Sequence, residues 1–230
     1  MLDEIGFKGN TAYFPEIDTL VLSDLHIGIE DAAVDEGMSM PLREAETLKR
    51  RLGNVLDFFE PSTVVFNGDV LHRFGEVGTS GKTLRDLRET VVDAGAESVF
   101  IKGNHDPMLD SLVETRDTYQ DGNVVFVHGH TVPVDLPESP LYVVGHDHPA
   151  IEIEMQKREC FIYGPFEDSD VLMTPAFNPL CQGVVINRMS ARDFMSPFIR
   201  ADLDEFRVVV ENEDGEVLRF PPLKEFRNML

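Results

Sequence analysis

The segment Thr19-Leu-Val-Leu-Ser-Asp-Leu-His26 joins a short apolar run to an aspartate and a histidine that lie two residues apart. A continuous apolar run of this length, bounded by polar residues, is typical of a strand buried on both faces. The same arrangement recurs along the chain, where apolar runs are followed at once by glycine, carboxylate, amide or imidazole side chains. The further runs are Thr63–Phe66, Ser98–Ile101, Val124–Val127 and Leu141–Val144.

Helical patterns separate the first three runs. Apolar residues at helical spacing predict a helix over Pro41–Phe59, with Pro41 in its first turn. A second, shorter pattern predicts a helix over Thr83–Ala94 that ends at Gly95. The alternation of strands and helices favours an α/β fold with a mostly parallel sheet.

After residue 150 the pattern changes to short runs that predict antiparallel strands of a second sheet. These runs are Ala150–Met155, Cys160–Tyr163, Val171–Thr174, Gly183–Asn187 and Phe206–Glu211. The Asp214-Gly215 pair predicts a hairpin turn before Val217–Phe220, and a last short helix is expected over Leu223–Met229. Since no linker or repeat divides the chain, we expect a single domain over residues 1–230, with the second sheet and C-terminal helix in residues 151–230.

All seven histidines fall between residues 26 and 148, close to the ends of predicted strands. The strand ends read Ser23-Asp24-Leu25-His26, Asn67-Gly68-Asp69, Lys102-Gly103-Asn104-His105-Asp106, His128-Gly129-His130 and Gly145-His146-Asp147-His148. Open α/β sheets bind ligands at the carboxyl ends of their strands, so we expect these side chains to converge on one crevice. The glycines permit tight turns and a close approach of the backbone to a ligand.

Imidazole and carboxylate donors suit manganese, iron or zinc better than magnesium or calcium. At three or four protein ligands per ion, the donors are too many for one ion and about right for two. Two ions roughly 3.5–4 Å apart stabilise the attacking and leaving oxygens of an in-line displacement at phosphorus. Each motif alone has an ordinary explanation, such as a helix cap or a buried histidine, and it is their joint occurrence that predicts the site.

In this order, the motifs DxH, GD, GNHD, HG and GHxH resemble the calcineurin-like metallophosphoesterase superfamily over residues 24–148. Two later segments, Pro175–Leu180 and Phe194–Phe198, resemble a compact archaeal and bacterial subfamily that is often encoded beside a DNA helicase or an ATP-dependent ligase. The resemblance implies a four-layer α-β-β-α sandwich of two mixed sheets flanked by helices.

The resemblance also implies two divalent metal ions, with Mn²⁺ as the first choice and iron, zinc or nickel as alternatives. It divides the metal ligands into those of one ion (Asp24, His26 and His148), those of the other (Asn104, His128 and His146) and the bridging Asp69. A hydroxide between the ions would attack phosphorus. His105, which is not a ligand, would protonate the leaving oxygen or stabilise charge on the phosphate.

The chain departs from better-known members of the superfamily near the second motif. Many of them carry GDxxD, whose second aspartate orients the catalytic histidine, and here His72 takes that place. The partner of His105 could therefore be His72, Asp106 or water. Arg73 stands where an arginine often touches substrate phosphate, although a solvated loop arginine fits as well. His130 could reach the site or simply satisfy the backbone.

The net charge is −22, from 42 acidic and 20 basic residues, and the acids are spread along the whole chain. Self-repulsion of this size is tolerated where salt screens it, which indicates a halophilic protein. It also argues against unaided binding of long duplex nucleic acid. The two cysteines, Cys160 and Cys181, do not form a CxxC pair, so we expect reduced, partly buried thiols rather than a disulfide or a metal site.

These observations favour a phosphodiesterase that acts on nucleotides or on nucleic-acid ends or strands, with a helicase or ligase as a candidate partner. The alternative is a phosphomonoesterase or general nucleotide phosphatase. A non-catalytic metal-binding partner of a helicase is disfavoured because no ligand position has been lost. No apolar stretch is long enough to span a bilayer and the N-terminus lacks a secretory pattern, so a cytoplasmic protein with no membrane partner is expected. The sequence leaves the oligomeric state open.

We predict that the melting temperature rises as KCl is increased from dilute to molar concentration. The Debye length falls to about 3 Å at 1 M salt, so repulsion among the acidic side chains is screened in the folded state. Thermal melts over this salt range measure the effect. A melting temperature that does not change with salt would contradict the halophilic interpretation.

Overall fold

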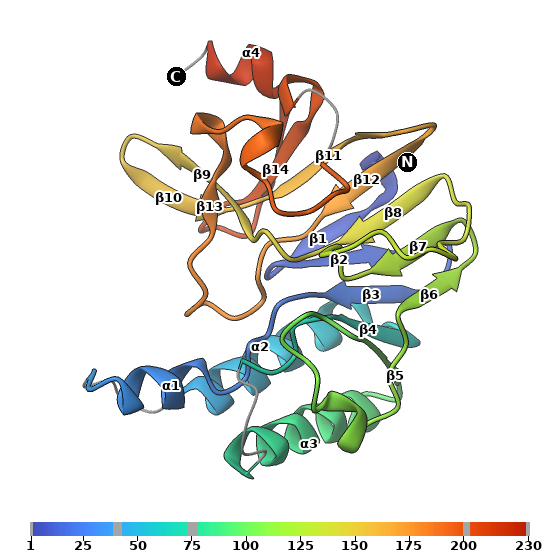
Figure 1. Ribbon diagram of the computed structural model, residues 1–230, viewed down its shortest axis with the longest axis vertical. Helices are drawn as coiled ribbons and strands as arrows, with labels where there is room; N and C mark the ends of the chain where they lie inside the picture. The colour runs from blue at the N-terminus through green and yellow to red at the C-terminus, as the bar shows by residue number, and fades with distance from the viewer. Residues whose placement is uncertain (1, 39–42, 73–77, 200–202, 229–230) are drawn as a thin grey trace.

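Two mixed sheets packed face to face form the centre of the computed structural model, which describes residues 2–38, 43–72, 78–199 and 203–228 (Figure 1). The first sheet has the strand order β1 (Gly6–Lys8), β2 (Thr11–Phe14), β3 (Thr19–Leu22), β4 (Thr63–Asn67) and β5 (Glu97–Ile101). Strands β3, β4 and β5 are parallel, while β1 and β2 extend the sheet in antiparallel fashion.

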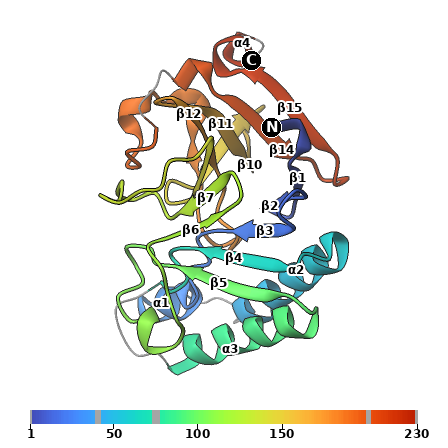
Figure 2. The same ribbon diagram turned by 90° about the vertical axis from the view of Figure 1, so that its right-hand side faces the viewer.

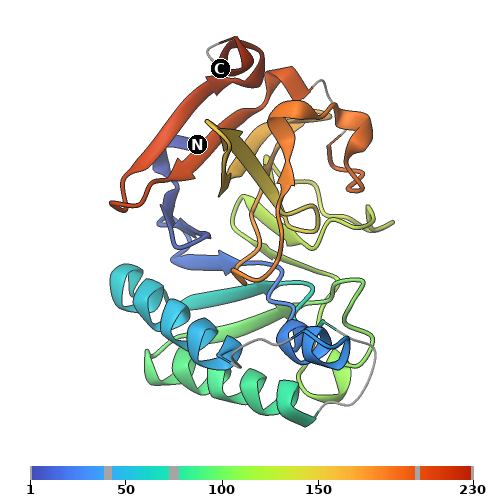
Figure 3. The same ribbon diagram turned by 90° about the vertical axis from the view of Figure 1, so that its left-hand side faces the viewer.

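Helices cover the outer face of the first sheet. The two long ones, α2 (Glu44–Phe59) and α3 (Gly78–Asp93), lie side by side below the strands, and the short α1 (Ile29–Asp35) lies on the same side of the molecule (Figures 2 and 3). The buried side of α2 carries Leu48, Leu52, Val55 and Leu56, which is the apolar stripe that predicted this helix. These side chains pack in one cluster with Leu20 and Phe66 of the sheet.

The second sheet has seven strands and includes residues from both halves of the chain. Its order is β15 (Val217–Pro222), β14 (Arg207–Glu211), β11 (Phe161–Phe166), β12 (Ser169–Met173), β8 (Leu141–Val144), β7 (Val124–Val127) and β6 (Thr118–Asp121). Three neighbours, β7, β8 and β12, are parallel. The core between the two sheets joins Val21 and Val65 of the first to Phe126, Val143 and Leu172 of the second.

The outer face of the second sheet packs against a thinner layer. It contains a small sheet of β10 (Gln156–Glu159), β9 (Pro149–Ile153) and β13 (Val184–Val185), several 3₁₀ turns and the helix α4 (Leu223–Arg227). The predicted four-layer sandwich of two mixed sheets is therefore confirmed, although short turns and one small sheet supply most of its last layer. Both chain termini lie at this end of the molecule (Figure 1).

The second sheet differs from the prediction in extent and direction. It already includes β6, β7 and β8, which lie before residue 150. The run Val171–Thr174 was expected in an antiparallel strand, but its strand β12 is antiparallel only to β11 and runs parallel to β8. The run Gly183–Asn187 contains only the two-residue β13, which pairs parallel with β9, and then a 3₁₀ turn. Apolar runs identify buried strands, but they carry no information on strand direction or sheet membership.

Several element boundaries also differ. Helix α2 begins at Glu44 rather than in the turn of Pro41, which lies outside the described residues. Helix α3 begins at Gly78 rather than Thr83, because its first turn consists of polar and glycine residues that give no apolar period. The last helix ends at Arg227, and Met229 is outside the described part of the chain. The sequence did not predict the short elements β1, β2, β6, β10 and α1.

The helices of the described residues are too short or too polar to cross a membrane.

Candidate metal centre

The loops that follow three parallel strands of each sheet meet at one end of the sandwich. In the first sheet they follow β3, β4 and β5, and in the second they follow β7, β8 and β12. Backbone hydrogen bonds join the loops of neighbouring strands, for example from the Asp24 N–H to the Gly68 carbonyl at 3.1 Å and from the His26 N–H to the Asp69 carbonyl at 2.8 Å. The expected convergence of the sequence motifs follows from this arrangement.

The first group of donors surrounds Asp24, which is fully buried. One donor atom from each of Asp24, His26 and Asp69 lies within 4.8 Å of the others. His148 Nε2 is 3.3 Å from Asp24 Oδ1, and His26 Nε2 is 3.8 Å from Asp69 Oδ2. These spacings leave room for one ion among the four side chains.

The second group surrounds His128, which is also buried. Its Nε2 lies 3.3 Å from Asp69 Oδ2 and 3.2 Å from Asn104 Oδ1. Donor atoms of Asp69, His128 and His146 lie within 4.8 Å of one another. Asp69 therefore belongs to both groups, and all seven predicted ligands lie in one cluster.

Asn67 fixes the orientation of the His128 ring, a role that the sequence motifs did not predict. The His128 Nδ1–H donates to the Asn67 carbonyl at 3.1 Å, which leaves Nε2 directed toward Asp69. The Asn67 side chain is itself buried and donates to the carbonyls of Val127 and Val143, each at 3.2 Å. This amide ties β4 to β7 and β8 directly beneath the centre. A polar residue at the end of an apolar strand was the sequence signal that could have identified Asn67.

The backbone is strained where it presents these side chains. Positive φ angles occur at Asp24 (57°), His26 (42°), Asp69 (47°), His146 (78°) and His148 (48°). Left-handed backbone at a non-glycine residue costs on the order of 1–3 kcal/mol and is concentrated at functional sites. Five such residues in one cluster indicate that the surrounding structure holds the loops in a conformation they would not otherwise adopt.

Two glycines allow the backbone to approach the buried carboxylates. A Cβ on Gly103 would lie 2.1 Å from Asp69 Oδ1, and one on Gly145 would lie 2.5 Å from Asp24 Oδ2. Neither position has room for a larger residue unless the neighbouring chain moves, because a Cβ on Gly103 would also lie 2.2 Å from the Asp69 backbone nitrogen and one on Gly145 would lie 2.7 Å from Ser23 Cβ. These two loops therefore lie directly against the carboxylates that are the predicted metal ligands.

The charges of the centre are compensated by imidazoles. Burial raises the pKa of Asp24, but nearby His148 and His128 lower it more strongly, so it stays below its usual value. Burial lowers the pKa of His128, yet its bond to Asp69 and the charge of Asp24 raise it to about 9. Within the described residues, no lysine or arginine pairs with Asp24 or Asp69. Two buried carboxylates among imidazoles and an amide oxygen fit the borderline transition ions that the sequence predicted.

His105 borders the centre on the side of His26, with the two rings 5.1 Å apart. Its backbone N–H donates to Asp69 Oδ1 at 2.8 Å. Its Nδ1 lies 3.2 Å from the backbone carbonyl of His72, and since a carbonyl only accepts, Nδ1 carries the hydrogen. The His72 carbonyl therefore accepts a hydrogen bond from the His105 ring, and the His72 ring lies 6.2 Å from that ring and nearly parallel to it.

Asp106 is buried and serves the backbone. Its carboxylate accepts hydrogen bonds from the N–H groups of Val70, Leu71 and Gly103, which ties the loop after β4 to the turn after β5. The His130 ring lies 5.4 Å from that of His128 and 6.1 Å from that of His146. Arg73 is outside the described residues.

The segment Pro175–Leu180 supports the loop that carries Asp24 and His26. The Phe177 N–H donates to the Ser23 carbonyl at 2.9 Å. The Asn178 side chain donates to the Leu25 carbonyl and to Glu44 Oε1, each at 2.8 Å. These bonds fix the position of the turn after β3 that carries Asp24 and His26.

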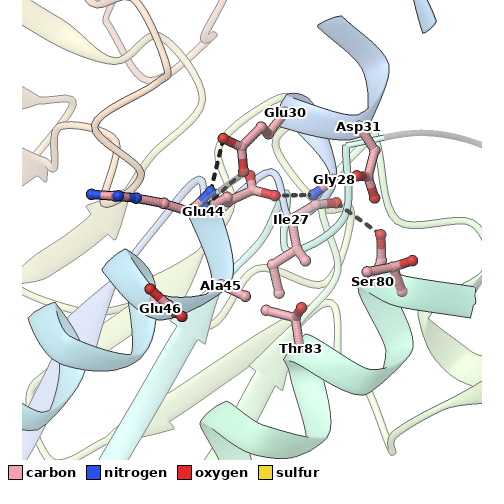
Figure 4. Close-up of a pocket in the computed structure, with 11 residues that line it drawn as sticks. Ile27, Gly28, Glu30, Asp31, Glu44, Ala45, Glu46, Ser80 and Thr83 are labelled. Atoms are coloured by element: carbon pink, nitrogen blue, oxygen red, sulfur yellow. Dashed lines mark hydrogen bonds between the residues drawn. The ribbon is translucent and has the colours of Figure 1, made fainter. Parts of the chain in front are cut away.

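The Glu44 carboxylate extends this support to α1. Its Oε2 accepts from the Gly28 N–H at 2.8 Å, while Glu30 accepts from the N–H groups of Arg43 and Glu44 at 3.0 and 2.7 Å (Figure 4). Each acid thus satisfies backbone donors at the start of the other helix, where the helix dipole favours negative charge. The loop after His26 is fixed to α2 by this exchange.

The segment Phe194–Phe198 supports the loops after β7 and β8. The Asp147 carboxylate accepts from the N–H groups of Met195 and Ser196 at 2.9 and 2.8 Å. The Ser196 hydroxyl donates to the Gly129 carbonyl at 2.7 Å. Both segments that carried the subfamily resemblance therefore contact loops of the centre rather than its open face.

The two cysteines differ from each other in their surroundings. Both are free and buried, and Cys160 lies in the apolar core of the second sheet. A donor atom of Cys181, however, lies within 4.8 Å of those of His26 and His148. Two free, buried thiols were expected and are found, whereas the closeness of Cys181 to two candidate ligands was not predicted. The neighbouring histidines are distant in sequence, so no spacing motif marks this cysteine.

Comparison with known proteins bears on the whole arrangement. The family model of the calcineurin-like phosphoesterases matches residues 17–150, a stretch that holds all seven predicted ligands. The chain belongs to this family. A search of curated proteins finds no match.

Among solved structures, the fold is similar to that of Pseudomonas putida nuclease MPE, with a TM-score of 0.63 and 20% identity over 94% of each chain. A Vps29 double mutant from Entamoeba histolytica aligns with 17% identity and a TM-score of 0.37, over 88% of this chain and 98% of that one. The cold-active protein-tyrosine phosphatase of a psychrophilic Shewanella aligns with 12% identity and a TM-score of 0.42, over 88% and 80% of the two chains. The nuclease shares the fold of this phosphoesterase along nearly its whole length.

We predict that Gly103→Ala weakens metal binding by roughly 10- to 100-fold, because the new methyl group displaces the Asp69 carboxylate. Gly53→Ala is the matched control. Gly53 lies within α2 and a Cβ there meets nothing within 4 Å, so this variant should bind metal normally and gain about 0.5–1 kcal/mol of stability. Metal titration and urea unfolding of both variants measure the two effects. Equal metal affinity in the two variants would contradict this reading of the glycine.

We predict that the apparent metal affinity of the metal-free protein rises with pH up to about 9. The pKa of His128 is raised from 6.5 to about 9, so its proton is bound near neutral pH and must leave before Nε2 can hold an ion. One proton lost per ion gives about a tenfold gain in affinity per pH unit below that value. Calorimetric titration in buffers of different ionisation enthalpy counts the protons released. A count of zero at neutral pH would refute the prediction.

Proposed function

We propose that this phosphoesterase is a dinuclear-metal-dependent phosphodiesterase that acts on nucleotides or on nucleic-acid ends or strands. The observation that carries the proposal is the position of Asp69 in both groups of donors. A carboxylate shared by two groups fits two ions close together, and a pair of ions suits displacement at phosphorus. Membership of the calcineurin-like phosphoesterases supports the same reaction class.

In this proposal the metal ligands are divided between the two ions as the family resemblance implied. One ion takes Asp24, His26 and His148, the other takes Asn104, His128 and His146, and Asp69 bridges them. Manganese is our first choice for the centre, with iron, zinc or nickel as alternatives. When bound, the ions supply positive charge toward the phosphate oxygens and a water molecule of lowered pKa as the nucleophile.

The chain's own residues position and complete this chemistry. The His105 N–H holds one oxygen of Asp69 at 2.8 Å, which leaves Oδ2 directed toward His26 and His128. Because the Nδ1–H of His105 is engaged by the His72 carbonyl, Nε2 is the nitrogen that would pass a proton to the leaving oxygen. A main-chain carbonyl fixes the ring and its tautomer, where a carboxylate would also add negative charge. We therefore assign the His72 side chain no essential part in orienting His105.

The surroundings of the centre support a nucleotide-sized substrate. A cavity of about 420 Å³ borders His128 and His130, and its lining also includes Lys102, Asp117 and Asp135. That volume is in the range of small-ligand sites. The fold shared with a nuclease points in the same direction. With a net charge of −22, we expect small diesters, or strands delivered by a partner such as a helicase or ligase, rather than unaided capture of long duplexes.

The deciding experiment is Mn²⁺-dependent hydrolysis of bis-(p-nitrophenyl) phosphate and of the corresponding monoester. We predict faster turnover of the diester, and a loss of roughly 10²- to 10⁴-fold for His105→Ala, the range for removal of a general acid. His72→Ala is the matched control, because the neighbouring side chain is removed while the carbonyl that holds His105 remains. It should keep most of the activity. Elemental analysis of the native protein should find two ions per chain.

Other outcomes select among the alternatives. Equal activity of the native and His105→Ala proteins would refute the role of His105. A preference for the monoester would favour the phosphomonoesterase alternative. Inactivity of the native protein with every divalent ion would favour a metal-binding module without catalysis. A consistent content of one ion per chain would contradict the dinuclear centre.

A further inference from the structure

The loop after β12 brings a sulfur atom to the centre, at the sixth strand end of the convergence. We propose that Cys181 is a ligand of the ion held by Asp24, His26 and His148, so that this position selects a thiophilic divalent ion such as Zn²⁺, Fe²⁺ or Co²⁺ over Mn²⁺. The inference rests on the dinuclear centre of the proposed function. It narrows the metal choice of that proposal, because manganese then stays the first choice only for the position held by Asn104, His128 and His146.

The position of the thiol fits coordination. One donor atom each from Cys181, His26 and His148 lies within 4.8 Å of the others. Zinc binds thiolate sulfur at about 2.3 Å and imidazole nitrogen at about 2.0–2.1 Å, which places the two donors of one tetrahedral ion about 3.6 Å apart. The observed spacing therefore requires an inward shift of roughly 1 Å at most.

The histidines of this group provide an independent sign that the pocket takes an ion. The His148 Nε2 is buried and makes no hydrogen bond in the described structure, although it lies 3.3 Å from Asp24 Oδ1. A buried polar atom without a hydrogen bond calls for explanation, and an ion held between His148 Nε2 and Asp24 supplies one. His26, whose side chain is 7% exposed, is shared by the thiol group and by the group with Asp24 and Asp69.

The backbone holds Cys181 at this place. Its N–H donates to the Asn178 carbonyl at 3.0 Å, and the Asn178 side chain anchors the same turn to Leu25. The thiol has only a weak contact of its own, with Sγ 4.0 Å from the Asp24 carbonyl. No strong hydrogen bond would have to break for the sulfur to turn to an ion.

The two groups of donors differ in chemical softness. The group around His128 offers nitrogen and oxygen atoms from Asp69, Asn104 and His146, whereas the group around His26 gains a sulfur. Thiolate favours zinc, iron or cobalt, while carboxylate and amide oxygens accept manganese readily. On binding, the sulfur–metal bond forms and the thiol proton passes to solvent. A mixed pair of ions, with the softer one beside Cys181, is the expected state in a cell.

Cobalt substitution tests the inference without reference to activity. Metal-free native protein, Cys181→Ala and Cys160→Ala are titrated with Co²⁺ and followed by near-ultraviolet absorption and by bound-metal analysis. Cys160→Ala is the matched control, because this second buried cysteine lies in the core away from the centre. We expect a thiolate-to-cobalt charge-transfer band in the native protein and Cys160→Ala, and its loss in Cys181→Ala. The preference of that position for Zn²⁺ over Mn²⁺ should fall at least tenfold with Cys181.

The results separate the two proposals. Two bound Co²⁺ ions without the band, or an equal band in native protein and Cys181→Ala, would overturn the thiol ligand and leave the dinuclear centre standing. Failure of the native protein to bind Co²⁺ would overturn both. If Cys181→Ala does not fold, ¹¹³Cd NMR of the native protein decides, because a thiolate moves the cadmium resonance far from that of nitrogen and oxygen sites. A resonance typical of nitrogen and oxygen ligands alone would refute the proposal.

Discussion

The burial of two carboxylates at the ends of neighbouring parallel strands is the constraint on which the rest of this structure depends. Asp24 and Asp69 are withdrawn from water, and in the described part of the chain they have imidazole and amide neighbours rather than lysine or arginine. Buried charge is costly unless it is paired. His128, whose pKa these carboxylates raise to about 9, lies between them, and a divalent cation is the stronger compensation that the same donors can hold.

Much of the remaining structure holds the loops that present these carboxylates. Left-handed backbone at five of the predicted ligands is maintained because neighbouring segments leave the loops no alternative. Asn67 ties the two sheets together next to His128, and Asn178 supports the turn after β3. Asp147 joins the turn after β8 to the segment Phe194–Phe198. Each of these residues is buried, and each forms hydrogen bonds with backbone groups of the loops around the centre.

The sequence predicted the parts of the fold that depend on local pattern. The strands Thr19–Leu22, Val124–Val127 and Leu141–Val144 were predicted with their observed bounds, because a short apolar run between polar residues has few other solutions. The start of α3 was missed since its first turn is polar and glycine-rich. Strand direction and the nearness of Cys181 to His26 were not predictable, because both arise from packing between segments far apart in the chain.

The charge of the chain and the chemistry of its centre act over different distances. At −22 the protein repels an anionic ester at long range, and salt shortens that repulsion to a few ångströms. Under the proposed function, attraction would then come from the bound ions and His105, because the adjoining cavity sets Lys102 against Asp117 and Asp135. Short-range recognition of this kind is little affected by salt, whereas binding through a basic surface is lost in it. Under the halophilic interpretation, an acidic surface around a buried metal centre is consistent with phosphoester chemistry in concentrated salt.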